Sequence, residues 1–199
     1  MGNAKDLKEA LENESITRIV LTDNISVDEP IIPAAGVTID GNGHELKFSN
    51  TGDGANSAEG LYIANDGVII KNLTIDGVNV THGDNLIEIY SNATLENVTV
   101  KNGKKNGIYV NHNSAGDITV NFKNITTDKN NWAGIGLVAQ KAGATLTANF
   151  TGTNSFGETV GVYSEQGTEE DPSAYPGSVV VNGLSEKAHD TKTYQKIYE

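Results

Sequence analysis

One pattern, written six times along the chain, constrains the fold more than any other feature of the sequence. Each copy holds two apolar residues two positions apart, followed by a glycine or an asparagine. The copies are VTIDGN from Val37, VIIKNL from Val68, ATLENV from Ala93, VNFKNI from Val120, ANFTGT from Ala148 and VVVNGL from Val179. Apolar residues at alternate positions are typical of a strand with one buried face. Repetition of such a strand indicates a solenoid, in which each copy occupies the same place in successive coils.

The residue after each apolar pair predicts a sharp corner in every coil. Glycine and asparagine tolerate the left-handed backbone conformation better than other residues do. The corner column is Gly41, Asn72, Asn97, Asn124, Gly152 and Gly183. Successive corners lie 25 residues apart between Asn72 and Asn97 and 31 apart between Gly41 and Asn72. We expect the asparagine side chains of neighbouring coils to form a hydrogen-bonded ladder.

Two further sets of strands complete the predicted coils. One set lies upstream of the corner strands: GLYI from Gly60, GIYV from Gly107, GIGL from Gly134 and GVYS from Gly161, with NLIEI from Asn85 as a looser member. Another follows the corner, at residues 73–75, 98–100 and 125–127. These segments are rich in Val, Ile, Thr, Phe and Tyr, which favours strands over a helical solenoid of the same period. The sequence therefore predicts an all-β fold, a single-stranded right-handed parallel β-helix of about six coils with three faces.

Two stretches near the start carry a family resemblance. The phrase GVTIDGNGHEL from Gly36, and LKEALENESITRIVL before it, resemble the first coils and the N-terminal cap of the pectate-lyase-like superfamily of right-handed parallel β-helix proteins. Since the motifs are structural, the resemblance concerns the fold more than any chemistry. Within that superfamily, the chain is most similar to a non-catalytic surface or adhesin-like member.

The ends of a solenoid need covers, because they expose unpaired strand edges and an open core. We expect a short capping α-helix over residues 3–14. Its apolar face is Ala4, Leu7, Ala10 and Leu11. Coils are predicted over residues 16–184, and a C-terminal cap or tail over 185–199. That last segment carries Tyr194, Ile197 and Tyr198. Residues 1–199 would then form a single β-helix domain.

Charge and composition exclude several classes of partner. Asp and Glu number 26 against 14 Lys and Arg, and the resulting net charge of -12 repels phosphate backbones and anionic headgroups. Nucleic acid binding and membrane insertion are therefore not expected, and the oligomeric state stays open. Without cysteine, the chain has no disulfide or thiolate metal site. Residues 1–16 lack the apolar core of a signal peptide. The resemblance implies an extracellular or cell-surface location.

A column of tyrosines suggests a binding face. Tyr62, Tyr109 and Tyr163 take the third position of their strands, and Gly136 takes that position in the coil between the last two. If the flanking apolar residues face inward, the rings face outward in one line and can stack on sugar rings. Polar partners and a loop tryptophan complete the predicted carbohydrate site: Asn111, His112, Gln140, Glu165 and Trp132. The alternative is that the tyrosines only stabilise the surface of the sheet.

The same face offers little for catalysis. The resemblance implies that lyases need clustered carboxylates with an Arg or Lys base, and that hydrolases need Asp residues on neighbouring coils. The single arginine, Arg18, lies in the capping strand. Glu88 and Glu165 are the acids near the tyrosine column, and their coils are too far apart for an acid/base pair. The pattern leaves open whether Glu88 faces outward, which requires Ile87 and Ile89 to face inward.

Other charged residues favour no metal or cofactor. Lys101, Lys104 and Lys105 share one connection and are interpreted as a solvated turn. The histidines are scattered over different coils: His44, His82, His112 and His189. Asp76, His82 and Asp84 share a connection where calcium is a minor alternative. We predict no catalytic residue, no metal site and no cofactor.

These features give one leading functional hypothesis and two alternatives. The leading hypothesis is a non-catalytic extracellular or cell-surface β-helix module that binds an extended glycan or a protein partner along its strand face. The first alternative is a polysaccharide lyase or glycoside hydrolase with an unconventional site. The second is a purely structural spacer or fibre segment that binds nothing. The sequence does not name the glycan or the partner.

Overall fold

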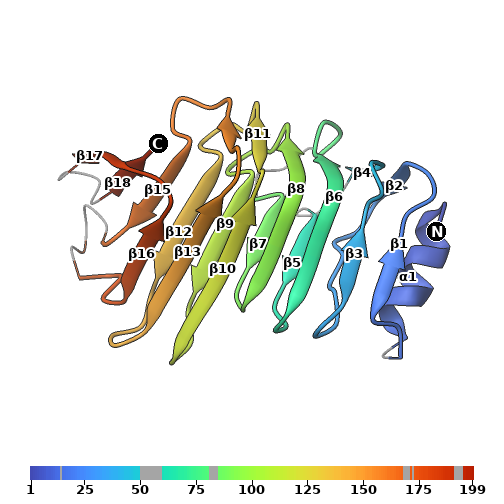
Figure 1. The fold of residues 1–199 in the computed structure, drawn as a ribbon, viewed down its shortest axis with the longest axis horizontal. Coiled ribbons are helices and arrows are strands. Elements are labelled where there is room, and N and C mark those ends of the chain that lie inside the picture. Colours follow the sequence, from blue (N-terminus) through green and yellow to red (C-terminus); the bar gives the residue numbers. More distant parts are fainter. Residues whose placement is uncertain (14, 50–59, 81–84, 168–170, 172, 191–194) are drawn as a thin grey trace.

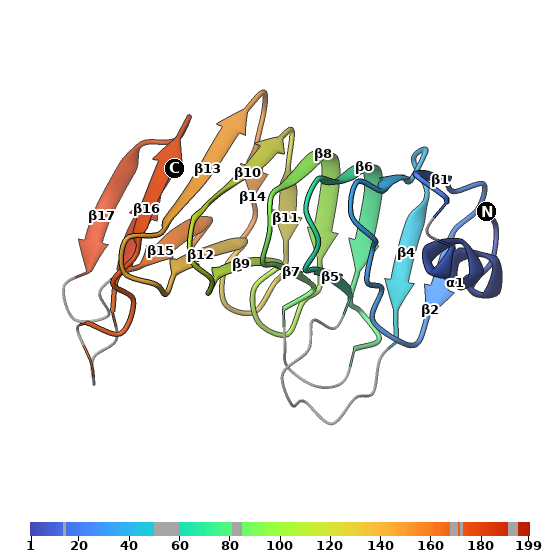
Figure 2. The ribbon, with the colours of Figure 1, turned by 90° about the horizontal axis from the view of Figure 1, so that it is seen from below.

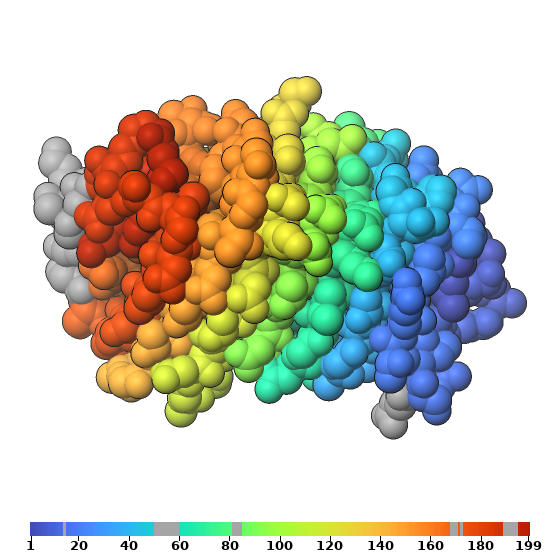
Figure 3. All heavy atoms as spheres, viewed as in Figure 1, coloured from blue at the N-terminus to red at the C-terminus, as the bar shows by residue number. Residues whose placement is uncertain are grey.

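The strands of the molecule stack along one long axis and wind as a β-solenoid. A computed structural model describes residues 1–13, 15–49, 60–80, 85–167, 171, 173–190 and 195–199. Helix α1 (Ala4–Glu12) lies at one end of the stack and the C-terminus at the other (Figure 1). In a space-filling view the coils follow one another in sequence order along this axis (Figure 3).

All six copies of the repeat lie in one parallel sheet. Its strands run in the order β1-β3-β6-β8-β10-β13-β16. Their bounds are β1 (Arg18–Val20), β3 (Thr38–Asp40), β6 (Val68–Asp76), β8 (Ala93–Lys101), β10 (Asp117–Lys123), β13 (Thr145–Thr151) and β16 (Ser178–Asn182). Short strands just past the corners pair in the same sheet: β2 (Ile25–Val27), β4 (Glu45–Phe48), β11 (Thr126–Asp128) and β14 (Ser155–Phe156).

A second sheet closes the other side of each coil. Its order is β5-β7-β9-β12-β15-β18-β17. The parallel members are β5 (Leu61–Ile63), β7 (Ile87–Ile89), β9 (Ile108–His112), β12 (Ile135–Ala139) and β15 (Val162–Glu165). The last two strands, β18 (Gln195–Tyr198) and β17 (Glu186–Asp190), pair antiparallel. Figure 2 shows the two sheets from below.

The regular solenoid has about four turns, fewer than the six coils expected from the six copies. Part of the difference arises at the C-terminal end. Strand β16 begins a coil that never closes, because the chain continues into the antiparallel pair β17–β18 instead of another strand parallel to β15. The predicted all-β parallel solenoid with one short N-terminal helix is otherwise confirmed.

The apolar columns of the repeat form the interior. In the second column Ile70 pairs in register with Leu95, Leu95 with Phe122, and Phe122 with Phe150. All four side chains are buried. The rings of Phe122 and Phe150 stack with centroids 4.8 Å apart. One side chain per coil therefore fills the same level of the core.

The asparagine corners are left-handed and linked through their side chains. Asn72, Asn97 and Asn124 have φ angles of 50°, 54° and 53°. Asn97 Nδ2 donates to Asn72 Oδ1 at 3.0 Å, and Asn124 Nδ2 donates to Asn97 Oδ1 at 2.8 Å. The ladder ends on Asp40, whose Oδ1 accepts from Asn72 Nδ2 at 3.0 Å. Gly152, the next corner, has a φ of 70°. Each asparagine corner thus bends the chain and also forms a side-chain hydrogen bond with the neighbouring coil.

The first corner differs from the expected one by one position. Gly41 does not have a positive φ, and the left-handed residue is Asn42, with φ 51°. Gly41 is small for another reason, since a Cβ there would lie 2.5 Å from the carbonyl oxygen of Asn72. The expectation that Gly41 bends the chain was therefore wrong, and its role is to allow close approach of the next coil.

The sixth copy is shifted by two residues from the alignment that the sequence suggested. Val179 pairs with Leu146, and Val181 with Ala148, so Gly183 lies opposite Phe150 rather than Gly152. Gly183 is left-handed, with φ 87°, and a Cβ there would overlap the carbonyl oxygen of Phe150. A shift of two residues keeps the same side chains inward, because side chains alternate with a period of two along a strand.

Helix α1 covers the N-terminal end of the solenoid, and the last strands extend the second sheet at the other end. In α1, Asn3 caps the helix by accepting from the backbone N–H of Asp6 at 2.9 Å, and Leu7 and Ala10 are buried against the first coil. At the other end β18 pairs with β15, and the Tyr198 side chain is buried in the core. Tyr194 lies outside the described residues.

Replacing Phe122 by Ala should lower the free energy of unfolding by about 3–5 kcal/mol, because it leaves a cavity between Leu95 and Phe150. Denaturant melts of the two proteins measure the difference. Thr119→Ala is the control, since this side chain faces outward from the same strand and should cost little. Equal losses in the two variants would contradict the assignment of inward and outward positions.

Replacing Asn97 by Val should destabilise the fold by more than about 1 kcal/mol, because a β-branched residue is strained at a φ of 54°. Asn97→Gly keeps the backbone conformation but loses both amide contacts, so it should cost less. Thermal melts of the two variants compare the contributions. A valine tolerated as well as glycine would refute the corner assignment.

Candidate functional site

The outer face of the second sheet carries the predicted tyrosine column. Strand pairing aligns Tyr62 with Glu88, Glu88 with Tyr109, Tyr109 with Gly136, and Gly136 with Tyr163. The question left open for β7 is settled, since both isoleucines that flank Glu88 are fully buried. One outward position in five successive coils therefore alternates between tyrosine and a different residue.

Gly136 interrupts this column and lets two rings converge. A Cβ on Gly136 would lie 2.7 Å from Tyr163 Oη and 2.8 Å from Tyr109 Cδ2. The rings of Tyr109 and Tyr163 therefore occupy the space above the glycine. Tyr163 is only 5% exposed. The tyrosines keep the outward column that the sequence predicts, but Tyr163 is nearly buried, because the missing side chain of Gly136 lets the neighbouring rings fold over it.

A hollow of about 280 Å³ opens beside these rings. It lies over β7, β9, β12 and β15 and the connections that precede them. Its lining residues are Asn85, Glu88, Tyr90, Lys105, Asn106, Tyr109, Asn111, Trp132, Tyr163 and Glu165. Five of the eight residues predicted for carbohydrate binding line it together: Tyr109, Asn111, Trp132, Tyr163 and Glu165.

Trp132 forms an exposed wall of the hollow. Its side chain comes from the connection before β12 and is 62% exposed. The backbone N–H of Trp132 donates to the carbonyl oxygen of Lys105 at 3.1 Å. Lys105 Nζ lies 5.5 Å from the centroid of the indole ring, within the range of a cation–π interaction. Lys105 therefore lies over the face of the indole ring, while most of the Trp132 side chain stays open to solvent.

Glu88 is held in a network of buried side chains. Its Oε1 accepts from Asn85 Nδ2 at 2.9 Å, and its Oε2 accepts from Tyr90 Oη at 2.8 Å. Burial, and then the contact with Glu88, raise the pKa of Tyr90, so the phenol stays protonated and donates. Asn85 Oδ1 in turn accepts from Asn106 Nδ2 at 2.9 Å. Glu88 is only 6% exposed, and both of its oxygens are fixed in position.

Asn106 brings a buried acceptor that has no partner. The residue is 2% exposed, and its Oδ1 makes no hydrogen bond. Sequence reasoning missed Asn85, Tyr90 and Asn106. A signal existed, because an asparagine stands two residues before Ile87 and again before Ile108, which are paired in the sheet.

The carboxyl group of Glu165 lies at the other end of the hollow. Burial raises the pKa of Glu165, and hydrogen bonds from Gln195 and Tyr163 oppose this shift. Burial also raises the pKa values of Tyr109 and Tyr163. The negative charge of Glu165 is the second cause and raises both pKa values further. The tyrosine hydroxyls are therefore neutral over the physiological range, and the ionisable groups facing the ligand space are the two glutamates and Lys105.

Three predicted residues do not line the hollow. His112 points into the core, where its Nε2 lies 2.7 Å from the carbonyl oxygen of Gly116. Gln140 Nε2 donates to Asn111 Oδ1 at 2.8 Å, so it orients a lining residue. Tyr62 packs beside Tyr90, with ring centroids 5.0 Å apart. His112 has no surface to offer a ligand, because it is fully buried.

The glutamates are too far apart to act as an acid/base pair. Glu88 in β7 and Glu165 in β15 are separated by three strand spacings, which is about 14 Å at about 4.8 Å each. Glycosidase carboxylates lie about 5–9.5 Å apart. The geometry therefore supports binding more than hydrolysis.

Of the basic residues named from the sequence, Lys105 lines the hollow, whereas Arg18 and Lys101 form ion pairs elsewhere. Arg18 donates to Asp40 at 3.2 Å, and Lys101 Nζ lies 3.1 Å from Glu45 and 3.3 Å from Asp76. These pairs lie along the first sheet, away from the tyrosine column.

Neither a metal site nor a membrane span is found in the described part of the chain. No three His, Asp or Glu side chains come together there in a way that could hold a metal ion. His82 and Asp84, named with Asp76 as a calcium alternative, lie outside the described residues. The described residues also form no helix that is long and apolar enough to cross a membrane.

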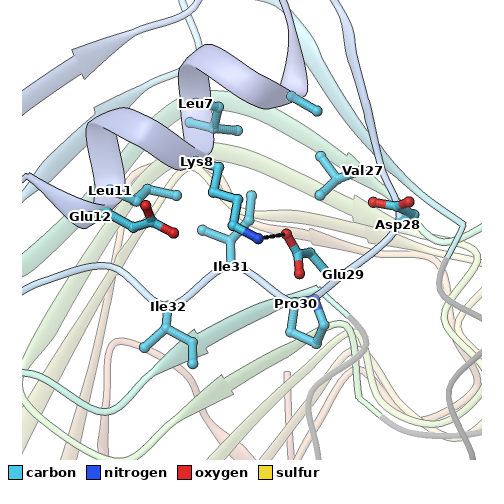
Figure 4. A pocket seen from close by; sticks show the side chains of 11 residues that line it. Leu7, Lys8, Leu11, Glu12, Val27, Asp28, Glu29, Pro30, Ile31 and Ile32 are labelled. Carbon is cyan, nitrogen blue, oxygen red and sulfur yellow. Dashed lines mark hydrogen bonds and ion pairs between the residues drawn. The ribbon is translucent and has the colours of Figure 1, made fainter.

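A second hollow, of about 270 Å³, lies between α1 and the segment after β2 (Figure 4). Its walls are largely apolar, with Leu7, Leu11 and Ile31 facing the space. The Lys8–Glu29 ion pair at 2.7 Å crosses one side. None of the predicted site residues lies here, and it lacks the aromatic rings and converging polar groups of the first hollow.

Replacing Glu165 by Gln should raise the melting temperature at neutral pH. Burial lifts the folded-state pKa above the unfolded value of about 4.3, so stability falls as pH rises through that window, and glutamine removes the penalty. Thermal melts over a pH series should show the gain vanishing below the unfolded pKa. An equal gain from Glu12→Gln, on the exposed side of α1, would assign the effect to net charge instead.

Comparison with known families agrees with this architecture. A family model described as "Putative pectate lyase-like adhesive domain" matches residues 2–155. Neither the curated proteins nor the solved structures gave a significant match. The matched range contains α1 and the coils up to the start of β14. It includes the part of the hollow that is lined by Glu88, Tyr109 and Trp132. Because the match covers most of the chain, the protein belongs to the pectate lyase-like adhesive domain family.

Proposed function

We propose that this protein is a non-catalytic adhesive module that binds an extended glycan along the outer face of its second sheet. The observation that carries the proposal is the hollow in which exposed Trp132 stands beside Tyr109 and Tyr163, with carboxylate and amide groups between them. Aromatic rings bind the apolar faces of sugars, and a few fixed polar groups orient the hydroxyls. An extracellular or cell-surface location is part of the proposal, in keeping with an adhesive family.

The arrangement of the hollow favours a chain over a single sugar. The lining residues come from strands β7, β9 and β15 and from connections next to β7, β9 and β12, so the site extends over four coils along the solenoid axis. Glu88 and Glu165 mark its two ends, about 14 Å apart. A monosaccharide placed beside Trp132 would leave one of these ends empty.

The polar network supports recognition more than packing alone. Cross-strand aromatic pairs that only stabilise a sheet do not require buried carboxylates beside them. Here Glu88 is buried and oriented by two donors, and Asn111 is oriented by Gln140. Such fixed polar groups around a partly open aromatic wall are typical of small-molecule sites.

Binding to a panel of oligosaccharides and polysaccharides tests the proposal. Trp132→Ala should weaken binding by about 5- to 150-fold, corresponding to about 1–3 kcal/mol for loss of one aromatic stacking platform. Isothermal titration with the best chain and with its monosaccharide should show preference for the chain. Trp132 is largely exposed, so the melting temperature should stay unchanged.

Ile32→Ala is the matched control, because Ile32 is another exposed apolar residue, 56% exposed, at the other hollow. It should leave glycan binding intact. The proposal fails if no glycan in the panel binds at millimolar concentration, or if Trp132→Ala binds as well as the parent protein. In either case the spacer alternative becomes the better account.

A further inference from the structure

We propose that the hollow selects glycans that carry protonated primary amines, namely chains of 2-amino sugars without N-acetyl groups. This inference rests on the proposed glycan binding and adds a ligand class to it. It follows from three observations on the lining residues: an excess of acceptors, an unpartnered buried oxygen, and a surplus of negative charge.

The donors deep in the hollow are already engaged with the protein. Asn85 Nδ2 and Tyr90 Oη both donate to Glu88, and Asn106 Nδ2 donates to Asn85 Oδ1. Acceptor capacity remains, because each carboxylate oxygen can accept more than one hydrogen bond. The Glu88 end of the hollow therefore favours a ligand that donates hydrogen bonds.

Asn106 Oδ1 is the clearest sign of a missing donor. A buried acceptor without a partner costs about 1–3 kcal/mol, and native proteins keep few of them. This oxygen belongs to a residue that is 98% buried and lines the hollow, beside the Asn85–Glu88 pair. The oxygen itself is enclosed, so a donor from a bound ligand satisfies it once the Asn106 side chain turns toward the hollow.

Charge distinguishes an ammonium group from a hydroxyl. The lining holds two carboxylates, Glu88 and Glu165, against one ammonium, and that ammonium, Lys105, lies over the Trp132 ring. The net charge of the protein is -12. An ammonium group has three donors and no acceptor, so it matches an acceptor-rich, negatively charged space better than a hydroxyl does.

The spacing of the carboxylates indicates a polymer of such sugars. Glu88 and Glu165 lie about 14 Å apart along the axis, which is longer than one sugar ring. Amines on separate units of one chain can meet each carboxylate, while the aromatic rings between them contact the sugar faces. An N-acetyl group would remove both the positive charge and two of the donors at each unit.

Isothermal titration with three chains of equal length tests this inference. The chains are a glucosamine hexamer, an N-acetylglucosamine hexamer and a glucose hexamer with the same β-1,4 linkage, all at physiological ionic strength. The glucosamine chain should bind at least about tenfold more tightly than the others, the difference expected for one charge-assisted hydrogen bond. Glu165→Gln should reduce its affinity by about tenfold and reduce the affinity for the glucose chain by clearly less, because glutamine keeps one acceptor oxygen but loses the negative charge.

Glu12→Gln controls for the general attraction between an acidic protein and a cationic chain, because Glu12 is exposed and outside this hollow. It should leave the affinity for the glucosamine chain unchanged. An equal loss in both variants would overturn the inference, as would a lysine hexapeptide that binds as tightly as the glucosamine hexamer.

The outcomes separate the two proposals. If the glucose and glucosamine chains bind equally and Trp132→Ala weakens both, glycan binding stands and selection for amines is refuted. If none of the three chains binds and the wider panel also fails, both proposals fall together.

Discussion

The structure depends on backbone hydrogen bonds between successive coils. Every regular strand pairs with the equivalent strand one coil away, so each coil must bend at the same place for the ladder to continue. Asn72, Asn97 and Asn124 meet this need with left-handed backbones and an amide ladder. Because the corners fix the register, equivalent inward side chains of successive coils lie above one another. The rings of Phe122 and Phe150 stack for this reason. Corner geometry is thus the source of both register and core.

The candidate site arises where one coil departs from the repeat. The outer column would be a plain stripe of side chains if every coil carried a tyrosine there. Gly136 removes one side chain, and the rings of Tyr109 and Tyr163 move into its place. Glu88 replaces another ring and draws Asn85 and Tyr90 around it. A solenoid fixes where each outward residue lies. A glycine and a glutamate at two positions of the tyrosine column are therefore enough to turn a flat face into a hollow.

The sequence predicted what the repeat controls and missed what depends on contacts between distant segments. The parallel solenoid, its inward columns and the outward tyrosine positions follow from periodicity alone. The burial of Tyr163 does not, because it depends on the absent side chain of Gly136 and on strand β18, paired beside it near the C-terminus. The network through Asn106 was missed because its partners meet only after the coils stack. The sequence did not predict the shift of Gly183, because a shift of two residues leaves the alternation of inward and outward side chains unchanged.

The fixed distance between coils also bears on why this face favours binding over catalysis. Two carboxylates at equivalent outward positions can be separated only by whole multiples of about 4.8 Å along the axis. Adjacent coils would suit a retaining hydrolase and alternate coils an inverting one. Glu88 and Glu165 are three coils apart and also lie in different columns. The column of Glu88 continues through Tyr109 and Gly136, and that of Glu165 through Val138 and Asn111, so neither column offers an acid between the two glutamates. No rotation of side chains on a rigid ladder brings them together around one glycosidic bond. The same separation is useful to a receptor for a long chain, because it places two charges along one extended ligand.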